Sequence, residues 1–276
     1  MIQYEWKRCF RAKGWKMAAV LALALAVGEF FGYRIFYKQY MHFLKAGQAL
    51  GDYLPSLYEG SLNGDIFTMF NMMYYYFFPL LAALPFGCSF FQDEELGSIK
   101  YIYALKPKEK YLTAKYLVVF FSGGMAAVLP AVFSFALNAL YVPAVVPHAM
   151  AMQSGIIDAL PLSEFYYSRP WIYFGVYLLL EMLAGGFLST LALIAGFYAK
   201  NVLLVLFTPM ICYIMSDYIL TEMGLQRYSL RILVNPVAAG AKEQVLWQEM
   251  FLEVILLATA TFLLFYLAGR KRERIV

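Results

Sequence analysis

The chain contains little charge, few cysteines and almost no histidine. Only 14% of its 276 residues are charged and 62% are hydrophobic, whereas a soluble domain is about 25% charged and roughly 45 to 50% apolar. This excess excludes a soluble globular enzyme. A content of 18% aromatic residues excludes a disordered chain, which would be low in hydrophobicity and high in charge. The class that remains is an integral membrane protein, and a net charge of +4 gives no reason to expect nucleic acid as a partner.

The sequence also lacks the short motifs of metal, redox and nucleotide sites. Its three cysteines, Cys9, Cys88 and Cys212, form no CxxC pair, so each is expected to be a small apolar filler. The two histidines, His42 and His148, are too far apart for an HExxH motif, and no stretch reads GxxxxGKS or GxxxxGKT. We therefore expect no cofactor, metal or catalytic residue on this chain, and any energy from ATP has to enter through another subunit.

Six stretches are apolar and long enough to cross a hydrocarbon core of about 30 Å, which takes roughly 20 residues of helix. They are 17–37, 70–91, 113–142, 171–197, 202–220 and 249–269. Because backbone polar groups in lipid must be satisfied within the segment, all six are expected to be helices. The sequence therefore predicts an all-α integral membrane protein in which residues 17–269 form a six-span transmembrane domain.

Basic residues are unevenly divided between the two sides that six spans define. Fifteen of the 22 lysines and arginines fall before the first span, around the loops after the second and fourth spans, or in the tail 270–276, and seven fall on the other side. Since cytoplasmic loops carry the excess of Lys and Arg, we expect both termini to be cytoplasmic and the protein to lie in the cell (plasma) membrane. The connections 38–69, 143–170 and 221–248 are then external.

Residues 1–16 mix apolar and basic side chains at helical spacing. Ile2, Trp6 and Phe10 stand among five basic residues, a pattern typical of a helix on the membrane surface; a ragged basic tail is the alternative. The apolar run that follows continues past Glu29, which is the length of a span rather than of a signal peptide. We therefore expect 1–16 to be a cytoplasmic interfacial helix that is retained.

The cytoplasmic loop 92–112 contains the most informative stretch. Residues 93–106 are expected to form one helix: an acidic run from Asp93 to Glu95 would occupy its first turn, where the helix dipole favours anions, and Pro107 would end it. Apolar residues recur along it at three- and four-residue spacing, and they are Leu96, Ile99, Ile102 and Tyr103. Such a helix could dock on a soluble partner and pass force to the spans, or it could be a solvated connector.

A motif in this loop resembles a known family. The pattern Glu95-x-Gly97-Ser98-Ile99, followed by Pro107, Lys110 and Lys115, is similar to the first cytoplasmic loop of ABC-2 type permeases, the membrane subunits of one class of ATP-driven exporters. In that family an acidic residue, a Gly-Thr or Gly-Ser pair, a Pro, a nearby basic residue and a Gly-Lys that opens the third span recur there. This chain departs from the pattern in that Lys110 stands where Arg is common and Ala114 replaces the Gly.

The resemblance implies six spans and a coupling helix seated in a groove of an ATPase. The contacts would come from Glu95, Gly97, Ile99, Pro107 and Lys110. It also implies a homodimer, or a heterodimer with a similar subunit, served by two separate ABC ATPase subunits that bind ATP and Mg. The exported cargo of such a permease would be a drug, an antimicrobial peptide, a lipid or a glycan, and the aromatic richness of this chain favours an amphipathic or hydrophobic cargo.

Two acidic residues, Glu29 and Glu181, lie deep within predicted spans, where an ionisable group costs at least about 2.5 to 3.5 kcal/mol. With Asn138 they could line a substrate path, or serve as ion sites in an ion-coupled secondary transporter. Alternatively they are protonated, or are satisfied by Arg34, tyrosine hydroxyls or Asn138. The tyrosine run 74–76 suits an aromatic belt at the membrane surface. An intramembrane enzyme is a third possibility, although both histidines fall outside the spans.

Small residues recur at four-residue spacing on the first span, at Ala24, Gly28 and Gly32. In lipid, such residues allow two helices to approach closely. The first span is therefore a candidate subunit interface, and close packing within the same chain is the alternative.

Overall fold

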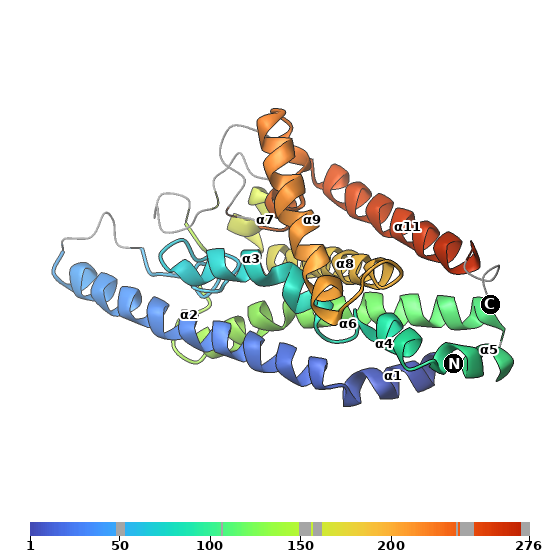
Figure 1. The fold of residues 1–276 in the computed structure, drawn as a ribbon. Coiled ribbons are helices and arrows are strands. Elements are labelled where there is room, and N and C mark those ends of the chain that lie inside the picture. The colour runs from blue at the N-terminus through green and yellow to red at the C-terminus, as the bar shows by residue number, and fades with distance from the viewer. Residues whose placement is uncertain are drawn as a thin grey trace.

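The computed structural model describes residues 1–47, 53–105, 107–148, 156, 162–235, 237 and 246–271. Within these ranges every regular element is a helix (Figure 1), and five helices are long and apolar enough to cross a membrane. They are α2 (Lys13–Lys45), α6 (Lys108–Asn138), α8 (Pro170–Ala195), α9 (Val202–Glu222) and α11 (Trp247–Lys271). The all-α membrane character predicted from the sequence is thus confirmed, with five such helices in the described part of the chain.

The stretch 70–91, predicted as the second span, does not form one helix. It is divided between α3 (Met69–Ala83) and α4 (Ser89–Glu95), which a turn over 84–88 separates. Pro85 in that turn has no N–H with which to continue the backbone ladder. With 15 residues, α3 is about 22 Å long at ~1.5 Å per residue, which is shorter than the hydrocarbon core of a bilayer.

Helix α6 lies between α2 and α8 and contacts both. The backbones of α6 and α8 approach so closely that side chains are excluded at several points. A Cβ on Gly124 would lie 2.2 Å from the carbonyl oxygen of Met182, and a Cβ on Gly185 would lie 2.5 Å from the Cβ of Ala127. Small residues therefore fix the centre of the bundle, as is usual for helices packed in lipid.

The molecule has two ends that we name for reference. The proximal end carries α1 (Ile2–Arg11), α5 (Ser98–Leu105), the start of α6 and the last turn of α11 (Figure 1). There the side chain of Arg270 lies 3.9 Å from that of Glu109. The distal end carries the end of α2 and the connection 53–68. The remaining short helices are α7 (Ser163–Ser168), η2 (Gln226–Tyr228) and α10 (Leu230–Val234).

The N-terminal helix is shorter than predicted. Helix α1 ends at Arg11 because Ala12 is extended (φ −64°, ψ 143°), and α2 then runs for 33 residues from Lys13. Two residues of α1, Glu5 and Cys9, are fully buried where this helix packs on α6. One face of α1 is therefore covered by the chain itself, which the amphipathic pattern alone did not indicate.

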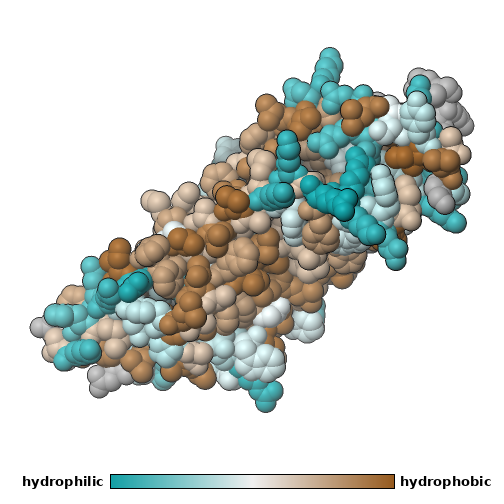
Figure 2. Space-filling model, turned by 90° about the horizontal axis from the view of Figure 1, so that it is seen from below, coloured by the Kyte–Doolittle hydropathy of each residue, from teal (hydrophilic) through white to brown (hydrophobic). Residues whose placement is uncertain are grey.

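The surface is divided along the length of the molecule. Hydrophobic side chains cover the middle of the face shown in Figure 2, and hydrophilic side chains gather towards its two ends. Helices α9 and α11 contribute many large exposed apolar side chains, such as Leu203, Ile211 and Leu256, each more than half exposed. This is the distribution expected of a multi-pass protein whose middle is surrounded by lipid.

Candidate functional site

The connection 53–68, predicted to be external, folds back between the helices. Leu62 is fully buried, and its backbone N–H donates a hydrogen bond of 3.0 Å to the hydroxyl of Ser134 on α6. The side-chain amide of Asn138 donates to the carbonyl of Gly60 at 2.8 Å, and that of Asn71 donates to the carbonyl of Leu62 at 2.5 Å. Irregular backbone at this depth is tolerated because protein groups satisfy it.

The candidate path residues Glu29 and Asn138 are brought into direct contact. Glu29 is fully buried, and its Oε2 accepts hydrogen bonds from Ser134 (2.7 Å) and from the Nδ2 of Asn138 (2.9 Å). The predicted alternative partner Arg34 lies elsewhere, with its guanidinium 5.0 Å from the centre of the Tyr141 ring. Asn138 is therefore a partner of Glu29, whereas Arg34 is held by an aromatic ring.

The third candidate path residue, Glu181, lies in a separate cluster. Its Oε1 accepts from the hydroxyl of Tyr75 (2.8 Å) and from the amide of Asn63 (3.1 Å), and its Oε2 accepts from the hydroxyl of Tyr74 (3.3 Å). Both tyrosines are buried, and only Tyr76 of that run is half exposed. The expected aromatic belt is thus wrong for two of the three tyrosines, because a buried carboxylate draws their hydroxyls inward.

The space beside the Glu181 cluster is too small for cargo. The cavity beside Asn63 and Tyr177 has a volume of about 10 Å³, which is room for about one water molecule. The segment that separates Glu29 from Glu181 includes Gly60 and Leu62, whose backbone contacts hold it in place. If the two carboxylates line a path, the connection 53–68 closes that path in this conformation.

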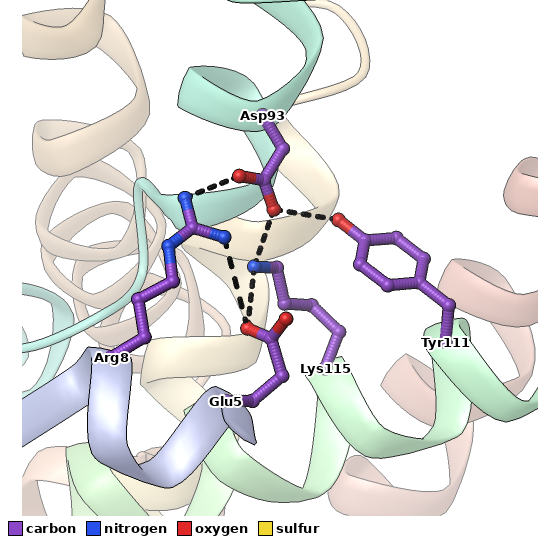
Figure 3. Close-up of polar contacts among 5 residues, drawn as sticks. All are labelled: Glu5, Arg8, Asp93, Tyr111 and Lys115. Atoms are coloured by element: carbon purple, nitrogen blue, oxygen red, sulfur yellow. Dashed lines mark hydrogen bonds and ion pairs between the residues drawn. The ribbon is translucent and has the colours of Figure 1, made fainter. Parts of the chain in front are cut away.

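A third cluster, at the proximal end, ties three helices together (Figure 3). The ammonium of Lys115 on α6 lies 2.9 Å from the carboxylate of Glu5 on α1 and 2.6 Å from that of Asp93 on α4. Asp93 also accepts a hydrogen bond from the guanidinium of Arg8 and one of 2.7 Å from the hydroxyl of Tyr111. We call these five residues the proximal network.

The proximal network is electrically balanced and almost dry. It contains two carboxylates and two cations, and the side chains of Glu5, Asp93 and Lys115 have no exposed surface. Burial opposes ionisation of Asp93, but the hydrogen bond from Arg8 and the charge of Lys115 outweigh it, so the pKa of Asp93 is lowered below its ordinary value. The Asp93 carboxylate therefore remains ionised at neutral pH, and its buried contacts, with that of Lys115 to Glu5, make the network a fixed joint between α1, α4 and α6.

The predicted helix 93–106 is wrong in its boundaries. Asp93 and Glu95 lie in the last turn of α4, and the chain turns at Gly97, whose φ of +67° favours glycine. The N–H of Gly97 donates to the carbonyl of Glu94 at 2.9 Å, so the turn closes α4 in the usual left-handed manner. The acidic run does not open a coupling helix because Asp93 is required by its two cationic partners.

Helix α5 faces the rest of the chain with one set of apolar residues and presents another set outward. Ile99 packs against the buried cluster at the proximal end, as do Ile102 and Tyr103. The outward set is Tyr101 and Leu105, which are 77% and 79% exposed, and Leu96 at the C-cap of α4 is 74% exposed as well. Most of the predicted docking edge thus packs against the chain itself. The outward edge of α5 is exposed instead and could contact a partner.

The remaining candidates for ATPase coupling surround α5. Glu95 is exposed at the end of α4, Pro107 is the exposed N-cap of α6, and Lys110 is exposed in the first turn of α6. They lie at the same end of the molecule as the outward edge of α5 (Figure 1). Lys106 lies outside the described residues. Whether these residues touch an ATPase stays a prediction.

The candidate subunit interface on α2 has neighbours within the chain at two of its three positions. A Cβ on Gly28 would lie 2.4 Å from the ring of Phe70, and one on Gly32 would lie 3.0 Å from a methyl group of Thr68. Ala24 is exposed. Gly28 and Gly32 thus allow α2 to approach the start of α3, and a role of this face in dimer formation stays a prediction.

A lateral cavity contains an acidic residue that the sequence reading overlooked. The cavity has a volume of about 360 Å³ and lies between α8, α9 and α11, with Leu188 and Leu257 among its apolar walls. Glu253 lines it, as does Tyr213, whose hydroxyl is buried and has no hydrogen-bond partner among the described residues. The sequence could have indicated this site, because Glu253 is an acidic residue within the predicted span 249–269, where an ionisable group needs a partner.

No protein-family model, curated protein or solved structure matches the chain.

Proposed function

We propose that the chain is the transmembrane subunit of an ATP-driven exporter of the ABC-2 type, acting as a homodimer or as a heterodimer with a similar subunit. Two separate ABC ATPase subunits would bind ATP and Mg, since the sequence has no nucleotide-binding loop. The proximal end would then be cytoplasmic. The observation that carries the proposal is the joint between α5 and the spanning helices.

The proximal network and Pro107 connect α5 to α6 in two ways. Through Gly97, α5 follows α4, whose Asp93 is bound to Lys115 of α6. At its other end α5 leads directly into α6, which begins after Pro107. A push on the outward edge of α5 would therefore reach α6 both through the backbone and through buried ion pairs, which a solvated connector would not need.

The cargo that fits this chain is amphipathic or hydrophobic. Export would require the connection 53–68 to withdraw from between Glu29 and Glu181, since its backbone is bound to Ser134 and Asn138. The lateral cavity with Glu253 offers apolar walls and one carboxylate, which suits a drug, an antimicrobial peptide or a lipid that carries a cationic group. The glycan cargo that the family also handles is less well matched to such walls.

The test is purification of the tagged chain from its own membrane. We expect an ATPase with a nucleotide-binding loop, identified by mass spectrometry, and ATP hydrolysis by the purified complex. Leu105→Glu should remove both, because it places a charge on the outward edge of α5. The matched control is Leu140→Glu, which alters a leucine of similar exposure (82%) at the other end of α6.

Two outcomes would contradict the proposal. One is equal loss of the ATPase in both variants, which would indicate a general effect of the added charge. The other is transport by the purified chain alone in vesicles, driven by an ion gradient without ATP, which is the behaviour of a secondary transporter.

A further inference from the structure

A large basic cavity opens at the proximal end and shares only Arg8 with the proximal network. Its volume is about 780 Å³, and it lies between the junction of α1 and α2, the turn 84–88 with the start of α4, and the start of α9. The wall between α2 and the turn is tight, since a Cβ on Gly14 would lie 2.0 Å from the carbonyl oxygen of Leu84. The cavity therefore lies beside a close backbone contact between α2 and the turn 84–88.

The charges that line this cavity are all positive. Lys7, Arg11 and Lys13 contribute to its lining, and none of the three makes an ion pair with a residue that the structure describes. Arg8 also lines it but is bound to Asp93. No acidic residue is among the described lining residues. Three unpaired cations around one cavity favour an anionic ligand.

One polar group in the wall lacks a partner. Ser89 is 2% exposed and lines the cavity, and its hydroxyl has no hydrogen-bond partner among the described residues. Buried hydroxyl groups in folded proteins are nearly always hydrogen-bonded. A ligand oxygen in the cavity would give this hydroxyl the acceptor that the chain does not provide.

Part of the cavity lining is apolar. It includes Met17 of α2 and Val202 and Leu206 of α9. These helices are among those long and apolar enough to cross a membrane, and Met17 is 59% exposed. A ligand in the cavity would thus meet both cations and apolar side chains of spanning helices.

We propose that this cavity binds an anionic phospholipid from the membrane leaflet at the proximal end. The lipid phosphate would lie among Lys7, Arg11 and Lys13 and accept a hydrogen bond from Ser89, and its acyl chains would follow Met17 and α9. Basic pockets between spanning helices are suited to anionic headgroups. The assignment depends on the cavity and its charges and is independent of the exporter proposal.

The experiment uses the full-length chain, purified in detergent and freed of lipid. Binding of phosphatidylglycerol is measured by native mass spectrometry, with phosphatidylcholine as the zwitterionic lipid and inorganic phosphate as the headgroup alone. The variant Lys7→Gln/Arg11→Gln/Lys13→Gln removes the three cations. The matched control is Lys16→Gln/Lys38→Gln/Lys45→Gln, which removes three cations of α2 outside the cavity lining.

We expect one tightly retained phosphatidylglycerol, little phosphatidylcholine, and a loss of affinity of roughly 100-fold in the cavity variant but not in the control. Ser89→Ala should weaken binding by less than the triple variant does. Equal retention of both lipids, or equal losses in the two triple variants, would overturn the assignment. So would saturable binding of inorganic phosphate without binding of the lipid, since a free anion would then be the ligand.

Discussion

The ammonium of Lys115 and a carboxylate oxygen of Asp93 lie 2.6 Å apart between α6 and α4, and neither side chain reaches the solvent. A buried ion pair contributes little net stability when compared with apolar residues of the same shape, but removal of one partner leaves an uncompensated charge. The pair therefore makes the joint between α4 and α6 costly to break. It is the structural reason why α5 and α6 should move together.

Lys115→Met should lower the free energy of unfolding by about 3 to 5 kcal/mol, because the carboxylates of Glu5 and Asp93 would lose their shared cation. Denaturant unfolding of the purified chain in detergent measures this. Lys110→Met is the control, since Lys110 is exposed and its loss should change stability little. A loss in Lys115→Met no larger than in the control would show that the network does not hold the helices.

Glu181→Gln should preserve the fold and alter transport, since an amide oxygen can still accept from Tyr75 while the ionisable carboxyl group is removed. Glu181→Ala should in addition reduce stability by about 1 to 3 kcal/mol for each buried donor left unpaired. Thermal unfolding and uptake into vesicles separate the two effects. Unchanged transport in a well-expressed Glu181→Gln variant would refute a role in the path.

Stability should fall as pH rises through the range set by Glu59. This residue lies in the connection 53–68, and its burial raises its pKa from the ordinary 4.5 to about 7, although the N–H of Ser56 donates to it. The folded state thus holds the proton more tightly than the unfolded state, so the contribution is complete below pH 4.5 and is lost as pH rises to about 7.

Glu59→Gln should remove this part of the pH dependence, because the amide cannot ionise and can still accept from Ser56. Thermal unfolding of the wild-type chain and the variant across that pH range measures the difference. If the unfolding temperatures of the two proteins change in parallel with pH, folding does not raise the pKa of the Glu59 carboxyl.

Gly28→Val should destabilise the single chain by about 1 to 3 kcal/mol, because its side chain would overlap the ring of Phe70. Ala24→Val should leave stability nearly unchanged, since Ala24 is exposed. Measurement of oligomeric state alongside unfolding tests the subunit interface as well. Loss of the dimer in Ala24→Val without loss of stability would show that Ala24 lies in the subunit interface. An unaltered dimer would show that Ala24 lies outside it.

Much of the candidate site could be located but not assembled from the sequence. Glu29 and Glu181 could be identified from their depth along a predicted span, because an acidic residue among apolar ones can be recognised in the sequence alone. Their partners come from elsewhere: Asn63 belongs to a connection expected outside the membrane, and Tyr75 to a run expected at its surface. The proximal network was missed because Glu5 and Lys115 are 110 residues apart and nothing local pairs them.

The amino-acid sequence alone is enough to identify a helical membrane protein, because long apolar runs can satisfy their backbone in lipid only as helices. It also shows where ionisable residues fall among apolar ones. The partners of these residues follow from the folded structure alone: Asp93 lies in the last turn of α4 instead of opening a helix, and residues 53–68 enter the bundle, where they contact Glu181 and Ser134. Helix formation depends on neighbours along the chain, whereas the pairing of buried polar groups depends on neighbours in space.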